Sequence, residues 1–301
     1  LGDKPKIFSF TNRQSNSNSK KSKPNKINGR VAGRVAKPGV FIPILPGTTG
    51  EYEAIRAFSK VGGIVDTFVF RSLTIEGIEE SFKVIAKKIN NSQVIMLPGG
   101  LCGDIQPGGS GRYIASVFQN PVVKEAVMDL LTKRDGLILG VGIGFQALLK
   151  LGLLPYGRYM DMQKDSPALT INNIGRTVSK IVSVRIASAL SPWHSNVNVG
   201  DVYLLPVSHG EGKFTAKGKD IDVMANNGQI VTQYIDIKGE PSYDIRYNPN
   251  GSIHAIESIT SPDGRILGKM GHPERISPDV VRNVPGDKNQ KIFEAGINYF
   301  K

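Results

Sequence analysis

The sequence predicts an α/β protein in which a mostly parallel central sheet carries helices on both faces and continues into a β-rich, largely antiparallel extension. Two observations support this prediction. Between residues 37 and 150, short apolar runs typical of buried strands alternate with segments whose apolar residues recur at helical spacing. Beyond residue 155, β-branched residues recur at near-alternate positions, which is typical of antiparallel strands.

Four strands and three helices are expected before the extension. The strands are expected at 40–45, 63–70, 94–97 and 136–140, and the helices at 51–61, 75–89 and 121–131. Gly-rich loops follow three of the strands, at 46–50, 98–103 and 140–144. Because parallel strands present their carboxyl ends at one edge of a sheet, we expect these loops to form one rim, where glycine lets backbone amides approach a ligand.

The extension is expected to contain several further strands and one last helix. The strands are expected at 177–188, 201–207 and 230–234, with a turn at 247–251 and a helix at about 290–299 that packs back on the sheet. Two motifs rich in polar residues fall in this region, Val-Ser-His-Gly-Glu-Gly at 207–212 and Met-Gly-His-Pro-Glu-Arg at 270–275.

Composition is that of an ordinary soluble protein, with 40% hydrophobic and 21% charged residues among 301. No apolar run approaches the roughly 18 residues that would cross a bilayer, and no secretion signal is evident. The single cysteine, Cys102, excludes an intrachain disulfide and a cysteine-rich metal site. We therefore expect an intracellular, most simply cytoplasmic, protein without membrane contact, cofactor or metal.

Most of the positive charge lies in the first 37 residues. This segment has ten Lys or Arg against one acid, Asp3, so it contributes +9 of the formal +12 and leaves +3 for the rest. Residues 11–30 are rich in Asn, Ser and Lys and hold few apolar groups, which favours a linker or disordered arm over a folded unit. We expect a basic arm at 1–37 and one domain at 38–301, with any nucleic-acid binding confined to the arm.

Residues 136–146 read as a strand, a sharp turn and a helix. An apolar run at 137–139 is followed by glycines at 140, 142 and 144, and a helical pattern then begins. Nucleophile elbows have this layout, because a strained turn holds one side chain at the end of a strand beside helix N-terminal amides. The apex of the turn would be Gly142, which has no side chain. The loop lacks both the G-x-G-x-x-G and the Gly-Lys-Ser/Thr fingerprint of phosphate binding.

His272 and Glu274 are the pair most like catalytic machinery. A carboxylate two residues from a histidine can hold the imidazole in one tautomer and support the imidazolium formed when the ring takes a proton. His209 and Glu211 are candidates for substrate contact, while a turn that buries a hydrogen-bonded histidine explains His209 equally well. No group of His, Asp and Glu has the spacing of a metal site.

The motifs taken together resemble the class I glutamine amidotransferase domain of phosphoribosylformylglycinamidine synthase, above all its large single-chain form. They occur in order from about residue 37 to residue 301. The matching segments are Phe-Ile-Pro-Ile-Leu-Pro-Gly-Thr at 41–48, Leu-Pro-Gly-Gly at 97–100, Gly-Ser-Gly-Arg-Tyr-Ile-Ala at 109–115, Gly-Phe-Gln at 144–146, Asn-Ile-Gly-Arg at 173–176, Ser-Pro-Trp at 191–193, Val-Ser-His-Gly-Glu-Gly-Lys-Phe at 207–214, Tyr-Asn-Pro-Asn-Gly-Ser at 247–252 and Gly-His-Pro-Glu-Arg at 271–275. The basic segment before residue 38 resembles the linker to the synthase part.

The resemblance implies a flavodoxin-like sandwich and a set of roles for individual residues. In this family a cysteine at the elbow attacks the glutamine amide, a histidine and a glutamate complete the triad, and the ammonia passes to the synthase. By motif, His272 and Glu274 are the triad partners. The resemblance places Gly99 and Gly100 at the oxyanion hole and Gln146 beside bound glutamine. The elbow expected is Gly-x-Cys-Asn-Gly-Phe-Gln, so Gly142 replaces the nucleophile and Ile143 replaces the asparagine.

Two functions follow from this resemblance. The first is a glutaminase-inactive domain, a pseudoenzyme, retained as a structural or partner-binding subunit of a synthase or a larger assembly, in which glutamine could still bind uncleaved. The alternative is an active glutaminase that supplies ammonia for formylglycinamidine ribonucleotide formation. That alternative needs another nucleophile, for which Cys102 in the Pro-Gly-Gly loop is the candidate.

Overall fold

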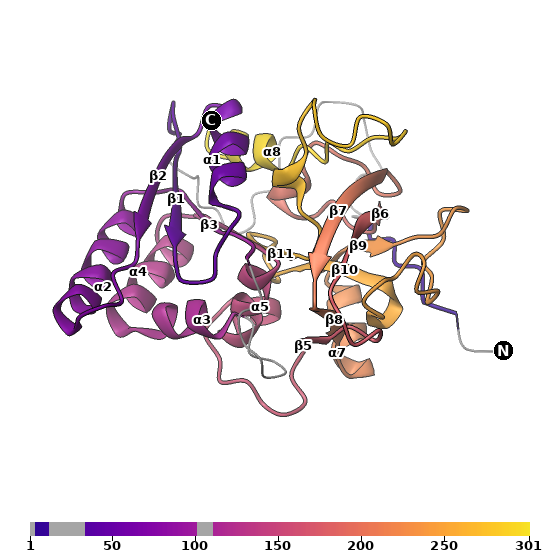
Figure 1. Cartoon of the computed structure of the whole chain (residues 1–301), viewed down its shortest axis with the longest axis horizontal. Coiled ribbons are helices and arrows are strands. Elements are labelled where there is room, and N and C mark those ends of the chain that lie inside the picture. Colours follow the sequence, from indigo (N-terminus) through magenta and orange to yellow (C-terminus); the bar gives the residue numbers. More distant parts are fainter. Residues whose placement is uncertain (1–3, 12–33, 101–110) are drawn as a thin grey trace, which may run out of the picture.

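The computed structural model describes residues 4–11, 34–100 and 111–301. Its centre is a nine-stranded sheet with the order β2-β1-β3-β4-β11-β10-β9-β6-β7, and a separate pair, β5-β8, lies beside it. Helices lie on both faces of the sheet (Figure 1). The predicted mixed α/β architecture is therefore confirmed.

The first half of the sheet is parallel. Strands β2, β1, β3 and β4 pair in parallel along this half, and the late strand β11 pairs in parallel with β4. The elements of this half are β1 (Gly39–Ile44), α1 (Glu51–Lys60), β2 (Ile64–Val69), α2 (Ile75–Asn90), β3 (Val94–Leu97), α3 (Arg112–Gln119), α4 (Pro121–Thr132) and β4 (Leu137–Val141). Each expected strand and helix is present within a few residues of its predicted bounds, whereas the sequence analysis missed α3.

The second half extends the same sheet in the antiparallel sense through β10, β9, β6 and β7. The strands of this part of the chain are β6 (Val178–Ile186), β7 (Val202–His209), β9 (Ile230–Tyr234), β10 (Ile256–Thr260) and β11 (Ile266–Lys269), together with β5 (Ala168–Ile171) and β8 (Glu211–Thr215) of the separate pair. Its helices and 3₁₀ turns are α5 (Ile143–Lys150), α6 (Leu153–Tyr156), η1 (Pro192–His194), α7 (Gly218–Asn226), η2 (Ile253–Ala255), η3 (Pro273–Arg275) and α8 (Ile292–Asn298). The extension was predicted as largely antiparallel, but its last strand, β11, returns to pair in parallel with β4.

The core is divided by the sheet into two layers. Alternate residues of a strand point to opposite faces, so Phe41 and Ile95 join one cluster with α2, α3, α4 and α5. Their neighbours Val40 and Val94 join the other cluster, with α1, α8 and the buried Trp193. The apolar runs of β1, β3 and β4 follow from this burial on both faces.

The N-terminal residues 4–11 lie against the second half of the sheet, where Phe10 forms an isolated parallel bridge with Ser188. The boundary between a basic arm and a domain at residue 38 remains a prediction from composition. In the part of the chain that the structure describes, every helix is too short or too polar to cross a membrane.

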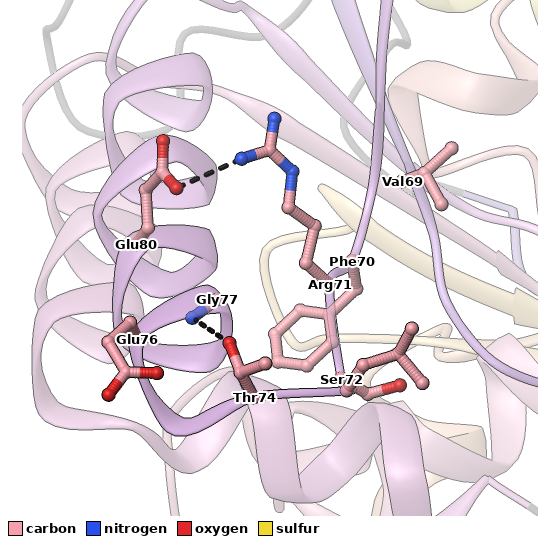
Figure 2. Close-up of a pocket in the computed structure, with 9 residues that line it drawn as sticks. Val69, Phe70, Arg71, Ser72, Thr74, Glu76, Gly77 and Glu80 are labelled. Atoms are coloured by element: carbon pink, nitrogen blue, oxygen red, sulfur yellow. Dashed lines mark hydrogen bonds and ion pairs between the residues drawn. The ribbon is translucent and has the colours of Figure 1, made fainter.

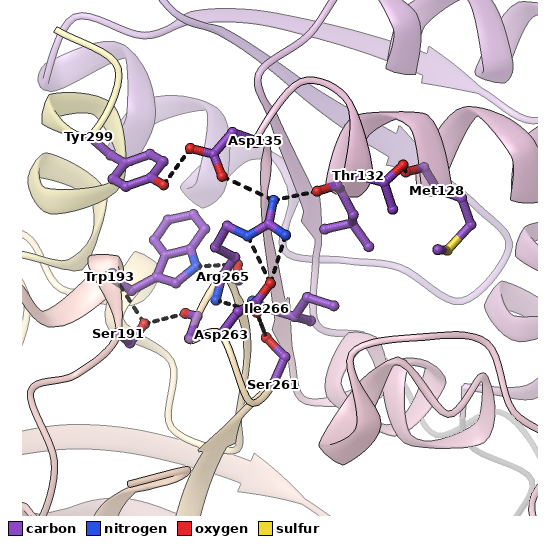
Figure 3. A network of polar contacts seen from close by, with 12 residues as sticks. Met128, Thr132, Asp135, Ser191, Trp193, Ser261, Asp263, Arg265, Ile266 and Tyr299 are labelled. Carbon is purple, nitrogen blue, oxygen red and sulfur yellow. Dashed lines mark hydrogen bonds and ion pairs between the residues drawn. The ribbon is translucent and has the colours of Figure 1, made fainter. Parts of the chain in front are cut away.

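A polar network joins the amino ends of β4 and β11 to the last helix (Figure 3). The Arg265 guanidinium contacts the carboxylates of Asp263 (2.7 Å) and Asp135 (3.2 Å). Asp135 also accepts a hydrogen bond from the Tyr299 hydroxyl (2.8 Å). The Trp193 indole N–H donates to the Arg265 carbonyl (3.1 Å). Arg265 therefore connects three segments that are far apart in the sequence.

Replacing Arg265 with methionine keeps most of the side-chain volume but leaves two partly buried carboxylates without their cation. We expect Arg265→Met to lower the free energy of unfolding by about 1–3 kcal/mol, measured by urea denaturation. Arg246→Met is the matched control, because Arg246 pairs with Asp244 at the exposed surface, and this variant should change the free energy of unfolding little. Equal losses in the two variants would contradict a special role for the Arg265 network.

Candidate functional site

The predicted elbow forms where β4 ends and α5 begins. Gly142 has φ 55° and ψ −114°, a conformation that side chains rarely adopt, and its N–H donates to the Lys269 carbonyl of β11 (3.0 Å). A Cβ on Gly144 would overlap the Leu97 carbonyl at the end of β3. The glycines therefore serve two purposes, a strained turn at Gly142 and a close approach of α5 to the sheet at Gly144.

His272 and Glu274 lie just after β11 and are almost fully buried. The His272 Nδ1 is 2.6 Å from the Glu274 Oε1, and the His272 backbone N–H donates to the Pro206 carbonyl of β7 (2.9 Å). A carboxylate accepts hydrogen bonds, so the His272 Nδ1 is the donor in this contact and Nε2 is the ring nitrogen left for another partner. Among the described residues, the His272 Nε2 has no hydrogen-bond partner.

The elbow and the histidine face each other. A Cβ built on Gly142 would lie 3.6 Å from the His272 Cε1 and 3.9 Å from its Nε2. A side chain with a γ atom at position 142 would thus start within reach of the imidazole nitrogen that is free to take a proton. This brings three of the predicted site residues, Gly142, His272 and Glu274, into one arrangement.

Gly99 and Gly100 border the same point from the end of β3. A Cβ on Gly99 would come within 2.8 Å of the His272 Cε1, so only glycine fits beside the ring. A Cβ on Gly100 would lie 2.8 Å from the Ile143 Cδ1. Ile143 is buried and packs its apolar side chain over Gly100, at the place where the resemblance implies an asparagine. The loop around Gly100 therefore meets an apolar side chain from the start of α5.

Gln146 is buried, and its side-chain amide donates to the Glu211 carbonyl of β8 (2.7 Å). This contact joins α5 to the motif at 207–212, which the sequence analysis treated separately. It occupies one amide hydrogen of Gln146 with the protein backbone. The position of Gln146 beside bound glutamine remains a prediction from the resemblance.

His209 lies at the carboxyl end of β7 and is buried and hydrogen-bonded. Its Nδ1 is 3.1 Å from the Asn172 Oδ1, which also accepts the Gly212 N–H (3.1 Å). Burial, and then the nearby His272, lower the pKa of His209 to about 4. The structure thus bears out the hydrogen-bonded histidine, while substrate contact by His209 and by the buried Glu211 stays a prediction. Asn172, which organises this turn, was not singled out from the sequence.

A buried charged cluster below the elbow was also missed. The Lys269 ammonium is 2.9 Å from the Glu257 Oε1, and both side chains are fully buried. Burial raises the pKa of Glu257, but the Lys269 charge and hydrogen bonds from Thr232 and the Gly271 N–H outweigh it and lower the pKa overall. His194 lies close by, and burial and the Lys269 charge lower its pKa to about 3. In the sequence, Glu257 and Lys269 are single charged residues within apolar segments, and nothing in the local pattern predicts that they form an ion pair.

The described residues contain no cluster of three His, Cys, Asp or Glu side chains that could hold a metal ion. Cys102 lies outside the described residues. A hollow of about 570 Å³ lies elsewhere, between the end of β2 and the start of α2 (Figure 2). It is bordered by Val69, Phe70, Thr74 and the Arg71–Glu80 ion pair, and by none of the predicted site residues.

A strand, a strained glycine turn and a helix, faced by a buried His–Glu pair in the turn that follows the adjacent parallel strand, define a site of the nucleophile-elbow class. Residues 37–300 match the CobB/CobQ-like glutamine amidotransferase domain, and the chain belongs to this family.

The chain is similar to subunits named PurQ of phosphoribosylformylglycinamidine synthase. It is 32% identical to that of Aquifex aeolicus over 202 residues, covering 66% of this chain and 80% of the relative. It is also 32% identical to that of Methanococcus maripaludis over 287 residues, covering 87% of this chain and 97% of the relative. Among solved structures, PurLQS from Thermotoga maritima shares the fold, with a TM-score of 0.62, 22% identity and coverage of 88% of this chain and 100% of that one.

Two of the buried histidines, His194 and His209, have lowered pKa values and therefore predict a pH dependence of stability. In the unfolded chain both take protons near pH 6.5, whereas in the folded chain their pKa values are about 3 for His194 and about 4 for His209. The unfolded state therefore binds more protons below pH 6.5, and stability is full above that pH and falls on acidification. We expect a loss of up to about 1.4 kcal/mol per pH unit for each histidine between pH 6.5 and 5.

Urea denaturation at pH 7.5, 6.5, 5.5 and 5.0 measures this slope, and the range stays above the region where Glu257 takes a proton. His194→Leu should reduce the slope, because it removes one of the two groups that must remain neutral. A free energy of unfolding that is constant from pH 7.5 to 5.0, or a slope unaffected by His194→Leu, would show that the histidines are not held neutral.

Proposed function

We propose that this protein is a glutaminase-inactive member of its family, retained as a structural or partner-binding subunit of phosphoribosylformylglycinamidine synthase in purine biosynthesis. The observation that supports this most directly is the geometry at Gly142. The backbone turn, the His272 imidazole and the Glu274 carboxylate are in place, but Gly142 lacks the Cβ that would lie 3.9 Å from the His272 Nε2.

The chemistry of amide transfer explains why this absence matters. A covalent intermediate forms when a nucleophile attacks the amide carbon and ammonia leaves, and the adjacent histidine only moves protons. Glycine supplies no sulfur or oxygen for that bond. The His272–Glu274 pair could still polarise a water, but the turn at Gly142 places no group to orient one.

The alternative, an active glutaminase that makes ammonia for the synthase, is favoured by one observation. The His272–Glu274 hydrogen bond is short, at 2.6 Å, and both side chains are buried. This is the arrangement of a histidine general base that is oriented by a carboxylate. This alternative also needs a nucleophile from another part of the chain, and the candidate remains Cys102. The two proposals differ in what the unmodified protein does with glutamine.

Glutamine hydrolysis should be undetectable for the wild-type chain and should appear in Gly142→Cys. We expect roughly 100-fold more glutamate release by Gly142→Cys than by wild type, because the new thiol lies beside a proton acceptor. Since position 142 has φ 55°, the substitution should also cost about 1–2 kcal/mol of stability. Glutamate formation is measured by a coupled dehydrogenase assay.

Gly175→Cys is the matched control, because Gly175 also has a positive φ and has open space around it. It should show the background rate. Adding His272→Ala to Gly142→Cys should remove the gained activity. Turnover by the wild-type chain that His272→Ala abolishes and Cys102→Ala also abolishes would favour the alternative over our proposal.

The partner we propose is the synthase chain, since the relatives with similar sequences are named as subunits of that enzyme. Mixing the pure protein with the synthase chain of the same organism at micromolar concentrations should give one complex in size-exclusion chromatography with light scattering. A glutaminase-inactive subunit should bind whether or not glutamine is present. Two separate peaks at every concentration would argue against a role as a synthase subunit.

A further inference from the structure

The N-terminal strap, defined as residues 6–10, is bound by the body of the protein through its backbone. The Phe8 N–H donates to the Gln233 Oε1 (3.0 Å), and the Gln233 amide donates to the Lys6 carbonyl (2.8 Å). Arg185 donates to the Phe8 carbonyl (2.8 Å) and to the Ser9 hydroxyl (2.7 Å). The Phe10 N–H donates to the Ala187 carbonyl (2.8 Å).

The groove that binds the strap presents hydrogen-bond donors and acceptors to the strap backbone. We call the set Arg185, Ala187, Gly228, Gln233 and His254 the strap groove. Gln233 is fully buried and offers the strap one acceptor and one donor, as a neighbouring peptide strand would. Without the strap, the Gln233 Oε1 would lose the Phe8 N–H that it accepts.

Side chains of the strap add selectivity to these backbone contacts. Phe8 and Phe10 are two residues apart, so in an extended segment they point to the same side. The Phe8 ring packs edge-on against His254, with 5.8 Å between the ring centroids. A Cβ on Gly228 would come within 2.6 Å of the Phe10 ring, so the groove has room for this ring only because residue 228 lacks a side chain. Lys6 also pairs with Asp222 (3.1 Å).

The strap lies outside the family match, which begins at residue 37. The strap groove therefore holds a segment that the amidotransferase domain family does not itself include. We propose that the strap groove is a peptide-docking site that recognises an extended segment with a lysine and two phenylalanines at positions 6, 8 and 10, and that its occupant is the strap of the same chain. The site is independent of any chemistry at Gly142.

The strap of the same chain is the expected occupant of the strap groove, because the tether gives it a high effective concentration there. A segment tethered to its own site binds as if present at millimolar concentration, so it competes well against free copies. A groove filled in this way should reject added peptide until the strap is weakened. A strap exchanged between two copies is the main competing arrangement, and it would produce dimers.

The test uses the full chain and a fluorescein-labelled peptide with the sequence of residues 4–11, followed by fluorescence anisotropy. The peptide should bind the double variant Phe8→Ala/Phe10→Ala at least ten times more tightly than it binds wild type, because the variant frees the groove. Adding Arg185→Met should weaken peptide binding at least tenfold. The control peptide carries alanine at both phenylalanine positions and should bind neither protein.

Hydrogen exchange provides a second measurement that needs no weakened strap. The Phe8 and Phe10 amides of the wild-type chain should be protected, and Arg185→Met should speed their exchange at least tenfold. Unprotected amides in wild type, or equal peptide binding by wild type and the double variant, would overturn the proposal. A dimer whose dissociation accompanies the double substitution would overturn the assignment of the occupant to the same chain.

Discussion

The site depends on the parallel pairing of β11 with β4. Residues 266–269 lie beside residues 138–141, and the register continues into the hydrogen bond from the Gly142 N–H to the Lys269 carbonyl (3.0 Å). Because the two strands end together, the turn that follows β11 carries His272 over the elbow that follows β4. A slip of one residue would turn the side chains of β11 to the opposite face and remove His272 from Gly142.

The buried pair of Glu257 and Lys269 fixes the backbone of the turn after β11 through the Gly271 N–H. Taking both charges out of water costs several kcal/mol per ion, and their attraction offsets this only when the remaining lone pairs are satisfied. Here the Gly271 N–H and the Thr232 hydroxyl donate to the Glu257 carboxylate. Since Gly271 precedes His272, the carboxylate fixes the chain one residue before the imidazole. We interpret the pair as a geometric constraint more than as a source of stability.

The residues around Gly142 hold the His272 ring in a defined place and orientation. Gly99 makes room for the His272 ring, and Glu274 holds that ring in one tautomer. Ile143 packs near Gly100 at the end of β3, and Gln146 donates to the Glu211 carbonyl of β8, so only Gln146 joins α5 to the extension. The strap groove lies in the antiparallel half and adds a second, separate binding feature.

Local sequence patterns determined most of the architecture. Apolar runs located β1, β3 and β4, because strands buried on both faces are largely apolar, and helical spacing located α1, α2 and α4, because each buries one stripe. The edge strand β2 is partly exposed and contains Asp66 and Thr67, and its β-branched and aromatic residues still indicated a strand. The glycine spacing at 140–144 located the elbow, and the short link between His272 and Glu274 indicated their hydrogen bond. These features depend on residues close together in the chain.

Tertiary structure alone decided the contacts between distant segments. Only the fold showed that β11 returns to β4, that Gln146 meets Glu211 and that Lys269 meets Glu257. The binding of the strap to the sheet was not predicted from the sequence, because five residues with two phenylalanines beside a basic segment do not indicate which part of the chain they contact. The physical reason is that pairing across a sheet is chosen by the burial and hydrogen bonding of the whole chain, whereas periodicity reports only which face of each element is apolar.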